Sequence, residues 1–90
     1  EAMVMHVDRF GNVITNLRPG DLEAGYGEVF RVRTSAGDVK CVFVKAYAHV
    51  PPGSPLLTVG GTGYIELSVN RGSAAGRYGL KPGDRIMVLR

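Results

Sequence analysis

The chain has 90 residues, of which 44% are hydrophobic and 21% charged, and this composition suits one globular domain. No run approaches the roughly 20 apolar residues that cross a membrane, and nothing resembles a signal peptide. The net charge of +3 is spread from Arg9 to Arg90 without a basic block, so we expect no nucleic-acid partner and no membrane partner. The single cysteine, Cys41, excludes an intrachain disulfide and indicates a cytoplasmic protein.

Short alternating or β-branched segments predict strands along the whole chain. In chain order, these expected strands cover residues 3–7, 13–17, 28–34, 39–47, 56–59, 64–69 and 85–89. A proline-rich connector at residues 49–55 cannot supply regular hydrogen bonding. Residues 22–26 can form one helical turn at most, and residues 73–78 a single turn that ends at Gly79. The pattern predicts an all-β fold, a small barrel or sandwich of about seven short antiparallel strands with one short helical turn.

The expected strand at residues 39–47 carries apolar side chains on both faces. Cys41 and Phe43 share one parity, while Val42 and Val44 share the other. Such a strand is covered on both sides, and we expect the second cover to come from another domain or subunit. The chain also begins without an initiator methionine and enters a strand pattern almost at once. We therefore expect residues 1–90 to form a single β domain that is a piece of a longer protein.

The sequence contains neither a complete nucleotide-binding motif nor a complete set of metal ligands. The glycines at positions 61 and 63 lack the third glycine of a dinucleotide fingerprint, because position 66 is Glu66, and they lead into a strand rather than a helix. His6 and Asp8 lie on the same side of a strand and could share an ion, but a metal site needs three or four ligands. We therefore expect no metal site.

The turn at residues 8–12 has two readings. As an ordinary hairpin turn, its Asp and Asn bond nearby backbone groups. As a binding site, Phe10 offers a flat platform for a purine, and Asn12 offers a paired donor and acceptor that match the N6 and N7 edge of adenine. Tyr47 is either a further stacking residue or an ordinary strand residue with its hydroxyl at the rim. Glu66 is a solvated charge if its face is wet, or an acceptor for a ligand amine or hydroxyl if it lines a cleft.

Two ordered motifs, VDRFGNVITN at residues 7–16 and GYIELSVNRGSAA at residues 63–75, are followed by GLKPGD at residues 79–84. Together they resemble the C-terminal domain of the S-adenosylmethionine hydroxide adenosyltransferases, the family that also holds the S-adenosylmethionine-dependent fluorinase and chlorinase. The resemblance implies a cytoplasmic two-domain enzyme, typically a trimer, whose active site lies between one subunit's C-terminal barrel and a neighbour's N-terminal domain. Such enzymes displace methionine from C5′ of S-adenosylmethionine with hydroxide or halide, with no metal or other cofactor.

The resemblance also implies roles for individual residues. It assigns the adenine part of the ligand to Phe10, Asn12, Tyr47, Val69, Asn70 and Arg71. It assigns the methionine part to Asp8, Gly61 and Thr62, and we add Glu66 to this group as an acceptor for a ligand amine or hydroxyl. Thr62 lies beside the position where the family often has a serine for the methionine carboxylate, and either its hydroxyl or backbone N–H groups could do that work. Ile14 stands where the fluorinase has a large aromatic residue, which favours water over halide as the nucleophile.

The family's water-activating residues belong to the N-terminal domain. The resemblance therefore implies no catalytic residue in this chain, which would supply the adenine- and methionine-binding half of an enzyme that converts S-adenosylmethionine and water to adenosine and methionine. The isolated domain is not expected to be active. As an alternative, residues 72–75 and 79–86 resemble the end of a PDZ domain, and the chain would then be a non-catalytic β-domain that binds a peptide or protein partner.

Overall fold

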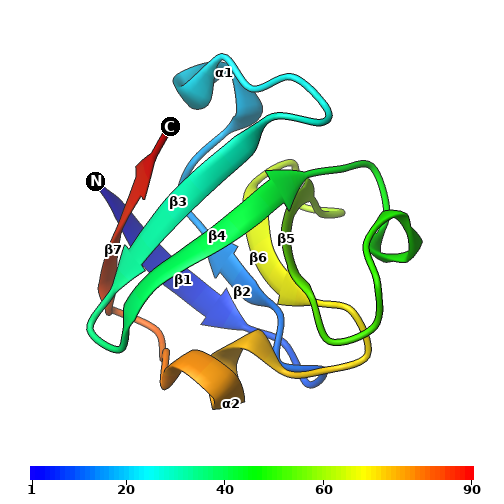
Figure 1. Cartoon of the computed structure of the whole chain (residues 1–90). Coiled ribbons are helices and arrows are strands. Elements are labelled where there is room, and N and C mark those ends of the chain that lie inside the picture. Colours follow the sequence, from blue (N-terminus) through cyan, green and yellow to red (C-terminus); the bar gives the residue numbers. More distant parts are fainter.

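Seven strands close into a small barrel in the computed structural model, which describes residues 1–90 (Figure 1). The order around the barrel is β1-β2-β6-β5-β4-β3-β7, and pairing of β7 with β1 completes the closure. The strands are β1 (Ala2–Val7), β2 (Val13–Thr15), β3 (Val29–Thr34), β4 (Gly37–Phe43), β5 (Pro55–Val59), β6 (Ile65–Val69) and β7 (Arg85–Leu89). The predicted all-β class is confirmed, and the architecture is a barrel rather than a sandwich.

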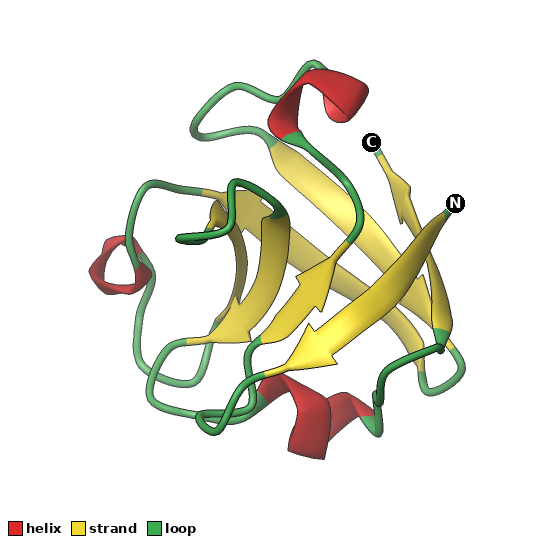
Figure 2. Ribbon diagram, turned by 180° about the vertical axis from the view of Figure 1, so that it is seen from behind, coloured by secondary structure: helices red, strands yellow, loops and turns green.

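Two short α-helices lie at opposite ends of the barrel, as Figures 1 and 2 both show. The predicted single turn is α2 (Ala74–Tyr78), which begins after the N-cap Ser73 and ends at Gly79 in the left-handed region. The other helix, α1 (Pro19–Leu22), lies earlier than the turn expected at residues 22–26, because proline is well suited to a first helical position. A 3-10 helix, η1 (Tyr47–His49), lies in the connector. None of these helices has the length and apolar character needed to span a membrane.

Alternation along β3 shows how the sequence fills the barrel. Phe30, Val32 and Thr34 are buried, while the intervening Arg31 and Arg33 are exposed. Each of the other strands adds side chains to the same core, so the interior is one hydrophobic cluster that also takes Ala74 from α2. The core therefore fixes α2 against one end of the barrel, and the loops at that end are held by the packing.

The pairing of β4 with β5 is parallel, whereas every other pairing in the barrel is antiparallel. Parallel neighbours need a crossover, and residues 44–54 provide it by passing outside the barrel. Val50 of this crossover packs with Val44 and Leu56 in a second cluster, against which Val42 also lies. The second face of the segment at residues 39–47 is therefore covered by the chain's own connector, which supplies the cover that was expected from another domain or subunit.

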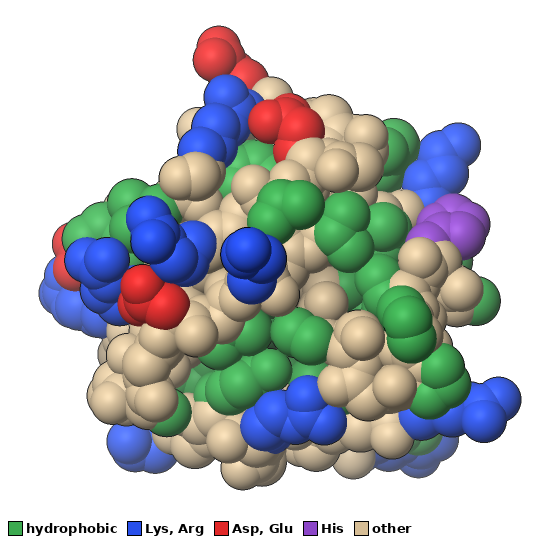
Figure 3. Space-filling model, viewed as in Figure 1, with side chains coloured by type: hydrophobic (Ala, Val, Ile, Leu, Met, Phe, Trp, Pro, Cys, Tyr) green, Lys and Arg blue, Asp and Glu red, His purple; other side chains and the backbone are tan.

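Basic side chains do not gather into one patch on the face that β3 and β4 present. Figure 3 shows them interspersed with hydrophobic, polar and acidic groups. Several are also engaged, since Arg31 and Arg33 both approach Asp38, and Arg90 approaches Glu28. These exposed pairs contribute little to stability, but they reduce the free positive charge on this face.

Candidate functional site

A cleft of about 700 Å³ opens where three separate segments meet near α2. The β1–β2 turn contributes Asp8, Phe10 and Asn12, and η1 contributes Tyr47. The end of β6 and the residues after it line the remaining wall, with Val69, Arg71, Gly72 and Ser73. A cleft of this size is in the range that holds small organic ligands. Five of the six residues predicted for adenine, together with Asp8, therefore lie around one cavity.

Asp8 organises the turn that presents the aromatic and amide side chains. Its Oδ1 accepts hydrogen bonds from the main-chain N–H of Phe10 at 2.9 Å and of Asn12 at 3.0 Å, and its Oδ2 accepts from the Asn12 Nδ2 at 3.0 Å. Partial burial acts to raise the pKa of Asp8, but the hydrogen bonds from Asn12 and Phe10, with a smaller effect of His6, hold this pKa below its usual value. Asp8 is therefore ionised at neutral pH. The turn that it organises leaves the Phe10 side chain 66% exposed at its tip.

Tyr47 links the crossover connector to this turn. The Asn12 Nδ2 donates to the Tyr47 hydroxyl at 3.1 Å, across 35 residues of sequence. Asn12 itself is buried, whereas Tyr47 is 41% exposed. The tyrosine lies in η1 rather than at the end of a strand, so its ring belongs to the rim of the cleft and not to the barrel core.

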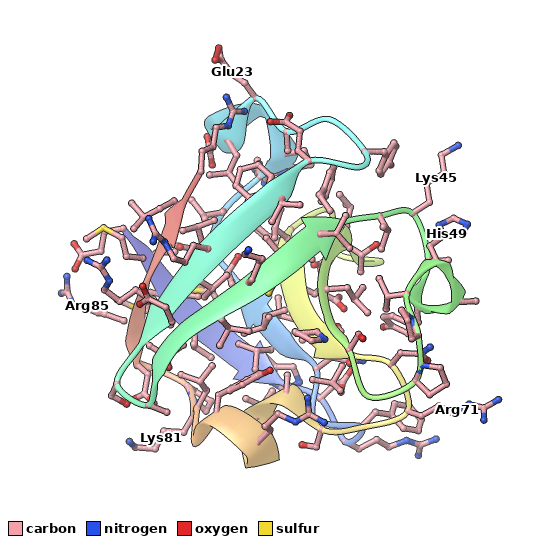
Figure 4. All side chains as sticks on the ribbon, in the orientation of Figure 1. Glu23, Lys45, His49, Arg71, Lys81 and Arg85 are labelled. Carbon is pink, nitrogen blue, oxygen red and sulfur yellow. The ribbon has the colours of Figure 1, made fainter.

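The segment after β6 supplies main-chain groups to the cleft. Arg71 has a φ of +58°, unusual for a residue other than glycine, and no hydrogen bond within the chain uses its N–H or its carbonyl. Figure 4 shows its side chain projecting away from the barrel. Gly72 and Ser73 complete this wall and were not predicted as site residues. A serine before a short helical segment is a typical N-cap, so the sequence indicated the helix start at Ser73 but gave no signal that this turn lines a cleft.

Asn70 is the one predicted adenine residue that does not line the cleft. Its Nδ2 donates to the Val50 carbonyl at 2.9 Å, and its main-chain N–H and carbonyl bond Ser54 and Gly53. These contacts tie the end of β6 to the connector that carries Tyr47. Asn70 thus holds the wall of the cleft in place, and its predicted contact with the ligand stays a prediction.

The residues predicted for the methionine part lie away from this cleft, apart from Asp8. Gly61 and Thr62 are exposed in the β5–β6 turn, at the opposite end of β6 from Val69. A strand of this length spans roughly 13 Å, so the two ends are well separated. A second hollow of about 220 Å³ lies on another side of Tyr47 and reaches Gly60 next to that turn. The residues predicted for adenine and those predicted for methionine therefore do not share one cavity. Tyr47 lines both the larger cleft and the smaller hollow, and so lies between the two groups.

Glu66 lies between these two regions on β6. It pairs with Ile14 of β2 and Thr58 of β5, and it is only 7% exposed. Its carboxylate lies against Gly60, and no hydrogen bond within the chain uses it. Burial raises the pKa of Glu66, and the charge of Asp8 raises it further. The face of β6 that carries Glu66 is therefore mostly closed to solvent, although the carboxylate oxygens themselves keep some solvent contact, and Glu66 lines neither of the two hollows.

The Glu66→Gln variant is expected to be more stable than the wild type at about pH 7.5, by about 1 kcal/mol at most, because it removes a partly desolvated charge that has no counter-ion or hydrogen-bond donor within the chain. The pKa of Glu66 is higher in the folded protein than its ordinary value of 4.5. The protonated side chain therefore favours the folded state at a pH below 4.5, and this contribution to stability is lost as the pH rises through the folded-state pKa. The difference between the two proteins should therefore vanish at about pH 4. Urea denaturation at both pH values measures it.

A matched control for this variant is Glu23→Gln. Glu23 projects from the end of the barrel near α1, as Figure 4 shows, and its side chain makes no hydrogen bond. Its substitution is expected to leave stability unchanged at both pH values. A Glu66→Gln variant that is less stable than the wild type at neutral pH would contradict the unpartnered state of this carboxylate.

The fold and the cleft define a small closed β-barrel domain with a ligand-sized cavity bordered by aromatic and amide side chains at one end. The chain belongs to the S-adenosylmethionine hydroxide adenosyltransferase family, because the model of that family's C-terminal domain matches residues 2–87. The resemblance stated from the sequence is confirmed. The alternative, a PDZ-like peptide-binding domain, is not favoured, since its two suggestive segments fall within the family match.

Relatives with assigned names cover the whole chain. It is 37% identical to the (R)-S-adenosyl-L-methionine hydrolase of Thermus thermophilus over 99% of this chain, and 37% identical to the enzyme of the same name from Salinispora tropica over 97%. The matched regions are 32% and 31% of those proteins, so the chain spans about a third of their length.

Solved structures agree with the barrel. A conserved, uncharacterized protein of Thermotoga maritima superposes with a TM-score of 0.93 at 34% identity, over 99% of this chain and 35% of that one. A conserved hypothetical protein of Thermus thermophilus gives a TM-score of 0.75 at 36% identity, over 98% of this chain and 34% of that one. In both matches the chain spans about a third of the solved chain's length.

Proposed function

We propose that this chain is the C-terminal domain of a two-domain S-adenosylmethionine hydrolase and forms the half of its substrate site that holds adenine and methionine. The complete enzyme would convert S-adenosylmethionine and water to adenosine and methionine. The observation that carries the proposal is the meeting of Phe10, Asn12 and Tyr47 around one cleft, in a chain whose family is named for this chemistry. Relatives that carry the hydrolase name support it.

Within this proposal, the adenine base lies between the aromatic side chains, and Asn12 hydrogen-bonds its edge. Stacking is worth about 1–3 kcal/mol per base. The free main-chain groups of Arg71 add further partners for the base. Glu66 and the turn that holds Thr62 would receive the methionine part, which would run past Tyr47 toward Gly60.

Catalysis would depend on the N-terminal domain, which orients water behind C5′ while this domain holds the substrate, a positioning effect. We propose a cytoplasmic homotrimer in which the site forms between subunits and needs no metal or cofactor. Burial raises the pKa of Cys41 to about 12 and leaves the thiol unreactive, so it takes no part in the proposed chemistry. Water is the proposed nucleophile, because the resemblance places the aliphatic Ile14 where the fluorinase has a large aromatic residue.

Calorimetry of the full-length protein with adenosine tests the adenine assignment. The Asn12→Ala variant is expected to bind adenosine about 3- to 10-fold more weakly, the effect of losing one neutral hydrogen bond. Asn16→Ala is a matched control, because the Asn16 Oδ1 accepts from the Met3 N–H, away from the cleft. If Asn12→Ala binds adenosine as the wild type does, the base does not lie at this residue.

A further inference from the structure

The amide of Asn12 is held in a single orientation by the protein. Its Nδ2 donates to Asp8 Oδ2 at 3.0 Å and to the Tyr47 hydroxyl at 3.1 Å. An amide nitrogen carries two hydrogens, and both are therefore used inside the chain. No hydrogen bond within the chain uses the Asn12 Oδ1, and Asn12 lines the cleft. The oxygen is the one polar atom of this amide left for a ligand.

The chemistry of Asp8 decides which end of the Asn12 amide faces it, even though the NH2 and oxygen ends have similar shapes. A carboxylate only accepts hydrogen bonds, so it requires the NH2 of Asn12, and not the oxygen, to face it. Asp8 is kept ionised by the N–H groups of Phe10 and Asn12 that converge on its Oδ1. Turning the amide around would place the Asn12 oxygen against the carboxylate, and two acceptors would then repel each other.

We propose that Asp8 and Tyr47 are positioning residues that fix Asn12 as a hydrogen-bond acceptor, so that the cleft selects a purine with an exocyclic amine at C6 and rejects a 6-oxopurine. The inference rests on the proposed function, since it requires a nucleoside in the cleft. It also changes the expectation that Asn12 gives the base a paired donor and acceptor, because its donor hydrogens are already taken. A 6-oxo group would meet the Asn12 oxygen with no hydrogen between them.

Calorimetry of the full-length protein with adenosine, purine riboside and inosine tests this selection. Purine riboside carries hydrogen at C6 and loses the hydrogen bond, whereas inosine places an oxygen there. We expect adenosine to bind most tightly, purine riboside to be intermediate, and inosine to bind about tenfold more weakly than adenosine or worse. None of these nucleosides has a methionine part, so a contact between Asp8 and methionine cannot affect the ratio.

The Asp8→Asn variant separates positioning from folding. It keeps an oxygen to accept from the Phe10 and Asn12 N–H groups, and it places an NH2 where Oδ2 lies. The Asn12 amide can then turn and present its own NH2 to the cleft, and the Tyr47 hydroxyl can donate to the turned oxygen. We expect the adenosine-to-inosine affinity ratio to fall by about tenfold. Tyr47→Phe keeps the ring but frees one hydrogen of the amide, and a smaller fall in the same ratio is expected.

Asp84→Asn is the matched control. Asp84 holds a similar turn by accepting from the Lys81 N–H at 3.0 Å, but it does not line the cleft, so the ratio should not change. Equal affinity of the wild type for adenosine and inosine overturns the inference, as does an unchanged ratio in a folded Asp8→Asn protein. The wild-type series decides the matter even if that variant does not fold. Failure of the wild type to bind any of the three nucleosides overturns the proposed function as well.

Discussion

Replacement of Gly11 by alanine is expected to lower the free energy of unfolding by roughly 2–5 kcal/mol. Gly11 has a φ of +84°, where a side chain is strained. An added Cβ would also overlap the Ser73 side chain and lie 2.8 Å from the Ser73 Cα. The N-cap of α2 would have to move, and with it the hydrogen bond of 2.9 Å from the Ala75 N–H to the Gly11 carbonyl.

The matched control is Gly83→Ala. Gly83 has a similar φ of +92°, but an added Cβ there would have no atom within 4 Å. The cost of the backbone strain alone is about 1–2 kcal/mol. Urea denaturation of the 90-residue chain compares the two variants. Equal losses would contradict the close contact between the β1–β2 turn and α2, because only Gly11→Ala adds a collision to the strain.

The same contact has a consequence for binding. The turn that carries Phe10 and Asn12 reaches its position only because Gly11 lets it lie directly on Ser73. A shift of α2 would therefore widen the cleft between two of its three walls. We expect Gly11→Ala to weaken nucleoside binding even under conditions in which the variant stays folded.

Local sequence patterns predicted the strands well because each strand has one face in the core. The alternation of β3 is a direct example, since Phe30 and Val32 point inward and Arg31 outward. The parallel pairing of β4 with β5 could not be predicted in this way. Nothing in either strand distinguishes a parallel neighbour from an antiparallel one, and the pairing depends on how residues 44–54 cross outside the barrel. Val50, in a proline-rich stretch of that crossover, packs on Val44 and Leu56 and covers the outer face of the barrel there.

The same contrast between local patterns and long-range contacts separates the parts of the site that could be predicted from the parts that could not. The turn at residues 8–12 is local, so its carboxylate, ring and amide could be assigned together from a short motif. Tyr47 joins it only through the closed barrel. Its place before the proline-rich connector suggested a stacking residue, but only the resemblance to a family linked it to the same ligand as the turn. The reversal of Asn12 from a paired donor and acceptor to an acceptor alone depends on that distant hydroxyl, which no local pattern contains.

The Phe10→Ala variant is expected to bind adenosine roughly 5- to 150-fold more weakly, which corresponds to the 1–3 kcal/mol lost when an aromatic platform under a base is removed. Phe10 is 66% exposed and packs on no core residue, so the change should leave stability within about 0.5 kcal/mol of the wild type. The Arg9 guanidinium lies 5.0 Å from the centroid of the ring and covers one face. The base would stack on the other.

Two further variants make this prediction specific to the aromatic face. Phe10→Leu keeps an apolar side chain of similar reach but removes the flat ring, and it should lose most of the affinity that Phe10→Ala loses. Met5→Ala removes an apolar side chain that is 54% exposed but does not line the cleft, and it should bind adenosine as the wild type does. Calorimetry with adenosine on the full-length protein measures all three. If Phe10→Leu binds as tightly as the wild type, the residue contributes apolar contact alone, and the adenine ring does not stack there.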